Sequence, residues 1–283
     1  MKSNNPVFAR TEEFNRASTN AYGNQTYPGG IVQGSSDPST WGTGTPTQER
    51  TGGRMTIDSV VQATGISVLL VMVTAAITWW YIGDVTAGTV SEDNLQRAIA
   101  LMTVGSLGAF GLSLVNSFKR VISPALVLAF AALEGVALGA LSKFFDAQFG
   151  GGIVTGAVLG TFAAFAGTLA AYKFFNIQVG AKFRAFVVAG MFGLVGLGLL
   201  SFVLSLFGVE TGLFGFGALG LLMSIAGLVL GVFMLILDFD FVENGVAAGL
   251  PERESWRAAF GLTVSLVWIY TNLLRILAIF SQD

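Results

Sequence analysis

Five polar residues stand beside or within apolar stretches, and their types limit the chemistry available to them. Glu134, Asp238 and Asp240 are carboxylates, Arg275 is a cation and Asn272 is an amide. An ionisable group in the bilayer core costs about 2.5 to 3.5 kcal/mol, so each needs a partner or a function. Carboxylate oxygens attract metal cations, which makes Asp238 and Glu134 the candidate metal ligands. We therefore treat the five residues as candidates for a cation pathway and its gate.

Their spacing indicates which of them could meet. Asp238 and Asp240 are two residues apart, roughly 200° around a helix axis, so both cannot face one site. Glu134 lies about 11 residues into its apolar run, near mid-bilayer, where a carboxyl must be protonated or paired. Arg275 is its most available cation, and Asn272 could hydrogen-bond to either group. A purely structural polar lock around Glu134, and a solvated helix end at Asp240, remain open interpretations.

Composition defines the class of protein that must position these residues. Of 283 residues, 53% are apolar and 11% charged, and the mean hydropathy is +0.70. These values are typical of an integral membrane protein. The chain has no Cys and no His, which excludes thiolate chemistry and imidazole bases, and its net charge of −2 indicates no nucleic-acid partner. We expect no cofactor and no enzymatic activity.

Seven apolar runs are each long enough to cross a bilayer as a helix, so an all-α bundle is predicted. The predicted spans lie near residues 60–82, 98–117, 123–142, 153–172, 185–207, 216–240 and 259–280. Most Lys and Arg residues fall in the N-terminal segment and in the connections after the second, fourth and sixth spans. Only Arg97 and Lys143 lie in connections on the other side. This excess of Lys and Arg on the side of the N-terminal segment predicts a cytoplasmic N-terminus and an external C-terminus in the cell membrane.

Residues 1–56 differ in composition from the apolar remainder. They are rich in Gly, Ser, Thr, Asn and Pro and poor in aliphatic residues, which predicts a disordered cytoplasmic tail ahead of a membrane domain at 57–283. Within that domain, three pairs of glycines four residues apart predict close helix packing, although glycine is common in membrane helices. The pairs are Gly135 and Gly139, Gly156 and Gly160, and Gly227 and Gly231.

Three segments resemble one known family. The runs PALVLAFAALEGVALGALS, LILDFDFVENG and SLVWIYTNLLRIL are similar to the transmembrane Bax inhibitor motif family, in particular its bacterial branch with a long polar N-terminal tail. The resemblance covers about Ile57 to Phe280. It implies a seven-helix fold whose polar last helix is wrapped by the other six. It also implies a pH-sensitive calcium leak channel, and in eukaryotes a modulator of cell death and calcium stores.

The family's gate is a pair of aspartates, and the resemblance assigns only one of them here. Asp238 takes the first position, whereas the second falls on Asn272, which cannot ionise. Glu134 or Asp240 could substitute, the leak could be constitutive, or the protein could fail to conduct calcium. The register of the last helix also stays open, because LLRIL could overlay a more distal arginine of the family.

These observations lead to a hypothesis with two alternatives. Glu134, Asp238 and Arg275 would form a charge lock whose opening admits calcium or another cation. The first alternative is a noncatalytic regulator that binds another membrane protein. The second is a proton-coupled transporter of a small solute, for which two related halves are expected and no clear repeat is found. In every case membrane lipid is a partner.

Overall fold

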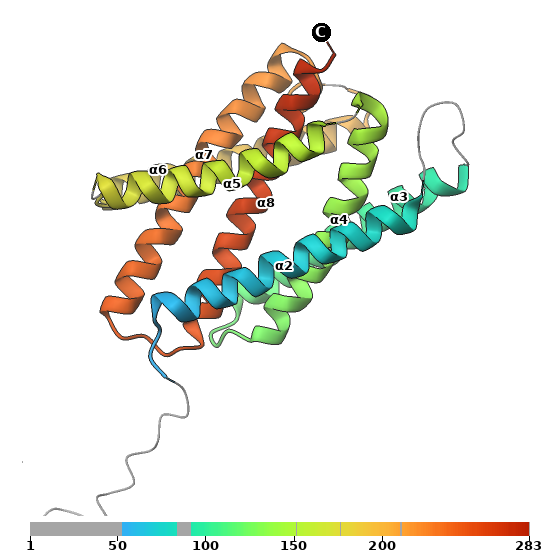
Figure 1. Ribbon diagram of the computed structural model, residues 1–283. Helices are drawn as coiled ribbons and strands as arrows, with labels where there is room; N and C mark the ends of the chain where they lie inside the picture. The colour runs from blue at the N-terminus through green and yellow to red at the C-terminus, as the bar shows by residue number, and fades with distance from the viewer. Residues whose placement is uncertain (1–52, 84–91, 151, 176, 210, 283) are drawn as a thin grey trace, which may run out of the picture. The chain divides into compact units, whose positions relative to one another are not determined.

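The computed structural model describes residues 53–83, 92–150, 152–175, 177–209 and 211–282. Its seven helices are each long and apolar enough to cross a membrane, which confirms the predicted multi-pass helical bundle (Figure 1). They are α2 (Ile57–Ile82), α3 (Glu92–Phe118), α4 (Pro124–Phe149), α5 (Ile153–Phe174), α6 (Ala181–Leu206), α7 (Ala218–Ala247) and α8 (Glu254–Phe280). Almost all of the predicted tail lies outside the described residues.

Local sequence signals set where several helices begin. Thr56 caps α2, because its Oγ1 accepts from the Ser59 N–H at 3.1 Å and Ser59 Oγ accepts from the Thr56 N–H at 3.0 Å. Pro124 occupies the first turn of α4, where its missing N–H costs no hydrogen bond. Gly152 precedes α5 at a φ of 107°, a conformation that favours glycine.

The last helix is central, as the family resemblance implies. It packs against α2, α4, α5 and α7, and both main apolar clusters include its side chains. Among the described residues, α3 packs on α4 and α2, and α6 packs on α7. The expectation that all six other helices surround α8 is therefore met by only four of them.

Two of the predicted glycine pairs mark very close helix approaches. A Cβ at Gly135 or Gly139 would overlap the α2 backbone, at Val71 and Ala75 respectively. On α7, a Cβ at Gly231 would lie 2.7 Å from Ile269 Cγ1 of α8. The predicted packing role is thus confirmed at these positions, since only a missing side chain allows such proximity.

Residues preceding α2 are tied to the loop between α7 and α8. The Met55 N–H donates to Leu250 O at 2.7 Å, and the Glu252 N–H donates to Gly53 O at 2.8 Å. Met55 is 2% exposed. We call residues 53–55 the strap. The strap therefore belongs to the same compact unit as the seven helices, and it lies at the α7–α8 loop end of the bundle (Figure 1).

Candidate functional site

Asp238 lies at the interface between α7 and α8. Its Oδ2 accepts a hydrogen bond from Ser265 Oγ at 2.5 Å. Its other oxygen lies over Gly261, where an added Cβ would be 3.0 Å away. Asp238 forms no ion pair with any residue in the described part of the chain. It is thus a half-buried carboxylate that faces the central helix with a hydroxyl, and not a cation, as its partner.

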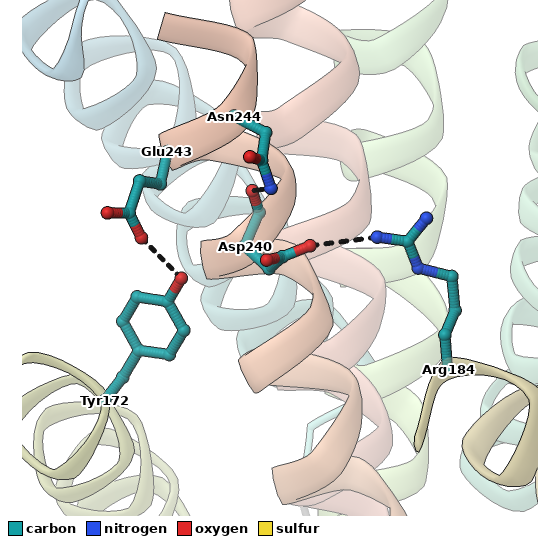
Figure 2. A network of polar contacts seen from close by, with 5 residues as sticks. All are labelled: Tyr172, Arg184, Asp240, Glu243 and Asn244. Carbon is teal, nitrogen blue, oxygen red and sulfur yellow. Dashed lines mark hydrogen bonds and ion pairs between the residues drawn. The ribbon is translucent and has the colours of Figure 1, made fainter. Parts of the chain in front are cut away.

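Asp240 points to a different neighbour. Its Oδ2 lies 2.9 Å from Arg184 Nη2 at the start of α6, and its side chain is 11% exposed against 61% for the arginine (Figure 2). The predicted angular separation of the two aspartates is confirmed. The solvated helix end considered for Asp240 is wrong, because α7 stays helical through Ala247 and the first turn of α6 covers Asp240.

Figure 2 shows two further polar contacts near Asp240. Tyr172 Oη donates to Glu243 Oε2 at 2.6 Å, which joins the end of α5 to α7. Asn244 Nδ2 donates to the Asp240 carbonyl at 2.8 Å. Tyr172, Arg184 and Asn244 were not among the residues predicted from the sequence. The available signal was the three-residue spacing of Asp240 and Glu243, which places both near the same end of α7.

Asn272 is buried but does not meet Asp238. Its Nδ2 donates to the Trp268 carbonyl of its own helix at 2.8 Å, and its side chain faces Gly227 of α7. Ser265, two turns earlier on α8, occupies the position opposite Asp238. The structure therefore pairs Asp238 with a serine where the resemblance pairs it with Asn272.

Arg275 and Glu134 lie away from Asp238. Arg275 Nη2 is 3.4 Å from the Gly215 carbonyl, and its guanidinium carbon is 5.4 Å from the Phe214 ring centroid. Glu134 is half-buried and makes no hydrogen bond or ion pair with a described residue. Ten residues separate Arg275 from Ser265, about 15 Å of helix rise. The expected charge lock between Glu134, Asp238 and Arg275 is therefore not formed in this conformation.

A line of polar contacts instead follows the interface of α7 and α8, which we call the seam. It starts at Asp238 and Ser265 and continues where Trp268 Nε1 donates to Gly227 O at 2.8 Å; beyond it, Arg275 of α8 approaches the Gly215 carbonyl just before α7. Between these contacts the helices are in tight contact at Gly231. The seam thus carries polar groups along its length while being closed by packing.

The described residues contain no group of three or more acidic, His or Cys side chains that could hold a metal ion. Asp238 and Glu134, the two candidate metal ligands, are not brought together into such a group. Calcium takes six to eight oxygen ligands, and Asp238 with Ser265 supplies three at most. These two side chains therefore cannot complete the coordination shell of a calcium ion by themselves.

Comparison with known proteins identifies a family. A family model described as Bax inhibitor 1 like matches residues 5–282, nearly the whole chain. No curated protein matches the chain.

Proposed function

The chain belongs to the Bax inhibitor 1 like family, and we propose that this multi-pass membrane protein is a pH-sensitive leak pathway for a cation, calcium in the first place. The proposed location is the cell membrane. The proposed route follows the seam between α7 and α8. Family membership supports a role within the membrane, and the arrangement of the seam supports the choice of route.

The observation that carries the proposal is the environment of Asp238. Its carboxylate is half-buried between two membrane helices and has no cation among the described residues. A negative charge held in a low-dielectric setting attracts a passing cation more strongly than one in water. Asp240 lacks this property, because Arg184 already compensates its charge.

The closed seam explains why such a pathway would leak and not conduct freely. Gly231 allows α7 to contact Ile269 of α8, and Trp268 spans the two helices by its bond to Gly227 O. A cation could pass only when this contact opens. The bond from Ser265 to the Asp238 carboxylate favours the closed contact, so changing the charge of Asp238 changes both the attraction for a cation and the closed state.

The test is calcium flux into liposomes containing the purified full chain, measured at two pH values. The Asp238→Asn variant carries no charge at position 238 at either pH value. It is therefore expected to bring the ratio of the two fluxes close to one. Asp58→Asn, the same change at an exposed residue at the start of α2, is expected to keep the wild-type ratio. An unchanged ratio in Asp238→Asn removes Asp238 from the mechanism. Wild-type protein with no flux favours a noncatalytic regulator instead.

A further inference from the structure

A cavity of about 470 Å³ lies between α2, α4, α5 and α8, away from the seam. Its floor includes Leu138 of α4 with Leu266 and Tyr270 of α8, each 8% exposed. The volume falls in the range of small-molecule sites, about 300 to 1,000 Å³. Nothing in the proposed leak mechanism uses this space.

The cavity opens sideways, between two helices that do not pack on each other. Met72 of α2 and Phe162 of α5 both line it and are 46% and 44% exposed. Both helices pack on α8, and Figure 1 shows them crossing in front of it. Because the exposed surface of a spanning helix faces lipid, the mouth faces the hydrocarbon of the bilayer.

Most polar groups in the wall are already hydrogen-bonded. Ser142 Oγ and Tyr270 Oη lie 2.6 Å apart, and Thr161 and Thr263 each donate to a carbonyl of their own helix. The remaining lining is mainly aliphatic, from Val68 and Val71 on α2 to Val158 on α5. Such walls offer little to water, whereas they suit an alkyl chain.

One end of the cavity is charged. Asp146 in the last turns of α4 lines it beside Thr155 and Trp79, and its carboxylate has no hydrogen bond or ion pair with a described residue. Lys143 Nζ lies 4.7 Å from the Trp79 ring centroid, so a positive charge stands near the same end. Trp79 is in the last turn of α2 and Thr155 in the first turn of α5, so this end lies at the membrane boundary.

We propose that this cavity binds one phospholipid with a zwitterionic phosphoethanolamine headgroup. One acyl chain enters between α2 and α5 and lies against Leu266 and Tyr270. The headgroup ammonium sits at Asp146, at the membrane boundary. A carboxylate at the rim matches a headgroup that carries an ammonium and matches a purely anionic headgroup poorly. This binding does not depend on whether the protein conducts cations.

The first test uses phosphatidylethanolamine with a photoreactive diazirine in one acyl chain. The full chain is reconstituted with this lipid and illuminated, and labelled peptides are identified by mass spectrometry. We expect labelling concentrated on α2 and α5 around Met72 and Phe162. Labelling spread evenly over the exposed surfaces of α3 and α6 as well would mean ordinary surrounding lipid, and would overturn the proposal.

Adjacent residues of α2 provide a matched pair of variants. Met72→Trp fills the mouth, whereas Val73→Trp adds comparable bulk at a residue that is 45% exposed but does not line the cavity. We expect Met72→Trp to lower labelling about tenfold, the scale of a small volume change in an apolar pocket, and Val73→Trp to leave it unchanged. Val158→Trp narrows the opposite wall, so a folding defect in one variant does not decide the result. Equal labelling in all three overturns the proposal.

Competition with unlabelled lipid tests the headgroup assignment. Phosphatidylethanolamine is expected to displace the probe better than phosphatidylglycerol from the wild-type protein. Asp146→Asn is expected to abolish that preference while keeping acyl-chain labelling. Equal competition by both lipids in the wild type would overturn the assignment of the ammonium to Asp146.

Discussion

Asp238 and Asp240 show how two aspartates on one helix acquire different roles. The helical rotation between them directs Asp238 to Ser265 on α8 and Asp240 to Arg184 on α6. Asp240 has its charge compensated by a guanidinium that remains largely in solvent. Asp238 has only a hydroxyl, so its charge remains available to a cation. This difference is why the proposed pathway uses one aspartate and not the other.

The Arg184 contact makes a prediction about stability. Arg184→Met leaves the Asp240 carboxylate, 11% exposed, without its cation. We expect the free energy of unfolding to fall by about 1 kcal/mol, since water screens the exposed guanidinium and limits the effect. Thermal unfolding of purified protein in detergent measures this change. Lys182→Met, at an exposed neighbour, should have little effect, and equal shifts in the two variants would contradict the role of the ion pair.

Individual residues of the candidate site could be predicted only in part. The cost of burying charge points to Asp238, Asp240, Glu134 and Arg275 alike, because that cost depends on residue type and span alone. Ser265, the partner of Asp238, could not be found this way, since serine carries no charge and its position depends on the register of α8 against α7. Arg275 was assigned to Glu134 by depth, but its side chain reaches the Gly215 carbonyl instead.

The seam between α7 and α8 depends on glycines that admit the opposite helix. A Cβ at Gly231 would lie 2.7 Å from Ile269 Cγ1 and 3.0 Å from Trp268 Cδ1. Tight packing here holds a polar interface shut, so stability and closure have the same cause. Substitutions in the seam should therefore change both properties together.

Gly231→Ala tests that coupling. We expect it to raise calcium flux in liposomes and to lower the free energy of unfolding by about 1 to 3 kcal/mol, because the added methyl forces α7 and α8 apart. Gly193→Ala in α6 adds the same methyl where no atom lies within 4 Å. It should leave flux unchanged and stability equal or slightly higher, since alanine favours helix. If Gly231→Ala loses stability without gaining flux, the seam is not the route.

The strap is a second element whose packing makes a prediction. Met55 is 2% exposed and belongs to the apolar cluster that includes Phe239 and Leu262. Met55→Ala should cost about 2 to 5 kcal/mol, the range for truncating a buried large side chain. Ile57→Ala, at a residue 61% exposed, is the control and should change stability little. Similar thermal shifts in both variants would show that the strap does not contribute to the core.

The spans were predictable at the level of elements, whereas their ends were not. An apolar run long enough to cross a bilayer is a strong signal by itself, and all seven predicted spans correspond to helices. The strap consists of Gly53, Arg54 and Met55 and continues a Gly- and Thr-rich segment, a composition typical of a tail. Its order comes from hydrogen bonds to residues 250–252, which are remote in sequence and leave no local pattern.

At the scale of the molecule, the seven spans of the described residues and the distribution of charge define a direction. The strap and the α7–α8 loop lie at one end of the bundle and the C-terminus at the other (Figure 1). Contacts such as Arg257 Nη2 to Arg120 O join basic segments at the strap end. Lys and Arg are enriched there, whereas Arg97 lies in the early turns of α3 and Lys143 in the last turns of α4, toward the other end. The bias favours a cytoplasmic strap end.

Single-cysteine labelling tests this orientation, and the chain contains no cysteine that would interfere. Ser281→Cys places an exposed thiol just beyond α8, and Val121→Cys places one between α3 and α4, where the side chain is 48% exposed. In intact cells a membrane-impermeant maleimide should label Ser281→Cys and should reach Val121→Cys only after permeabilisation. The reverse pattern would place the strap end outside. Asp238, which lies nearer that end of α7, would then face the external solution and not the cytoplasm, so a leak would sense external pH.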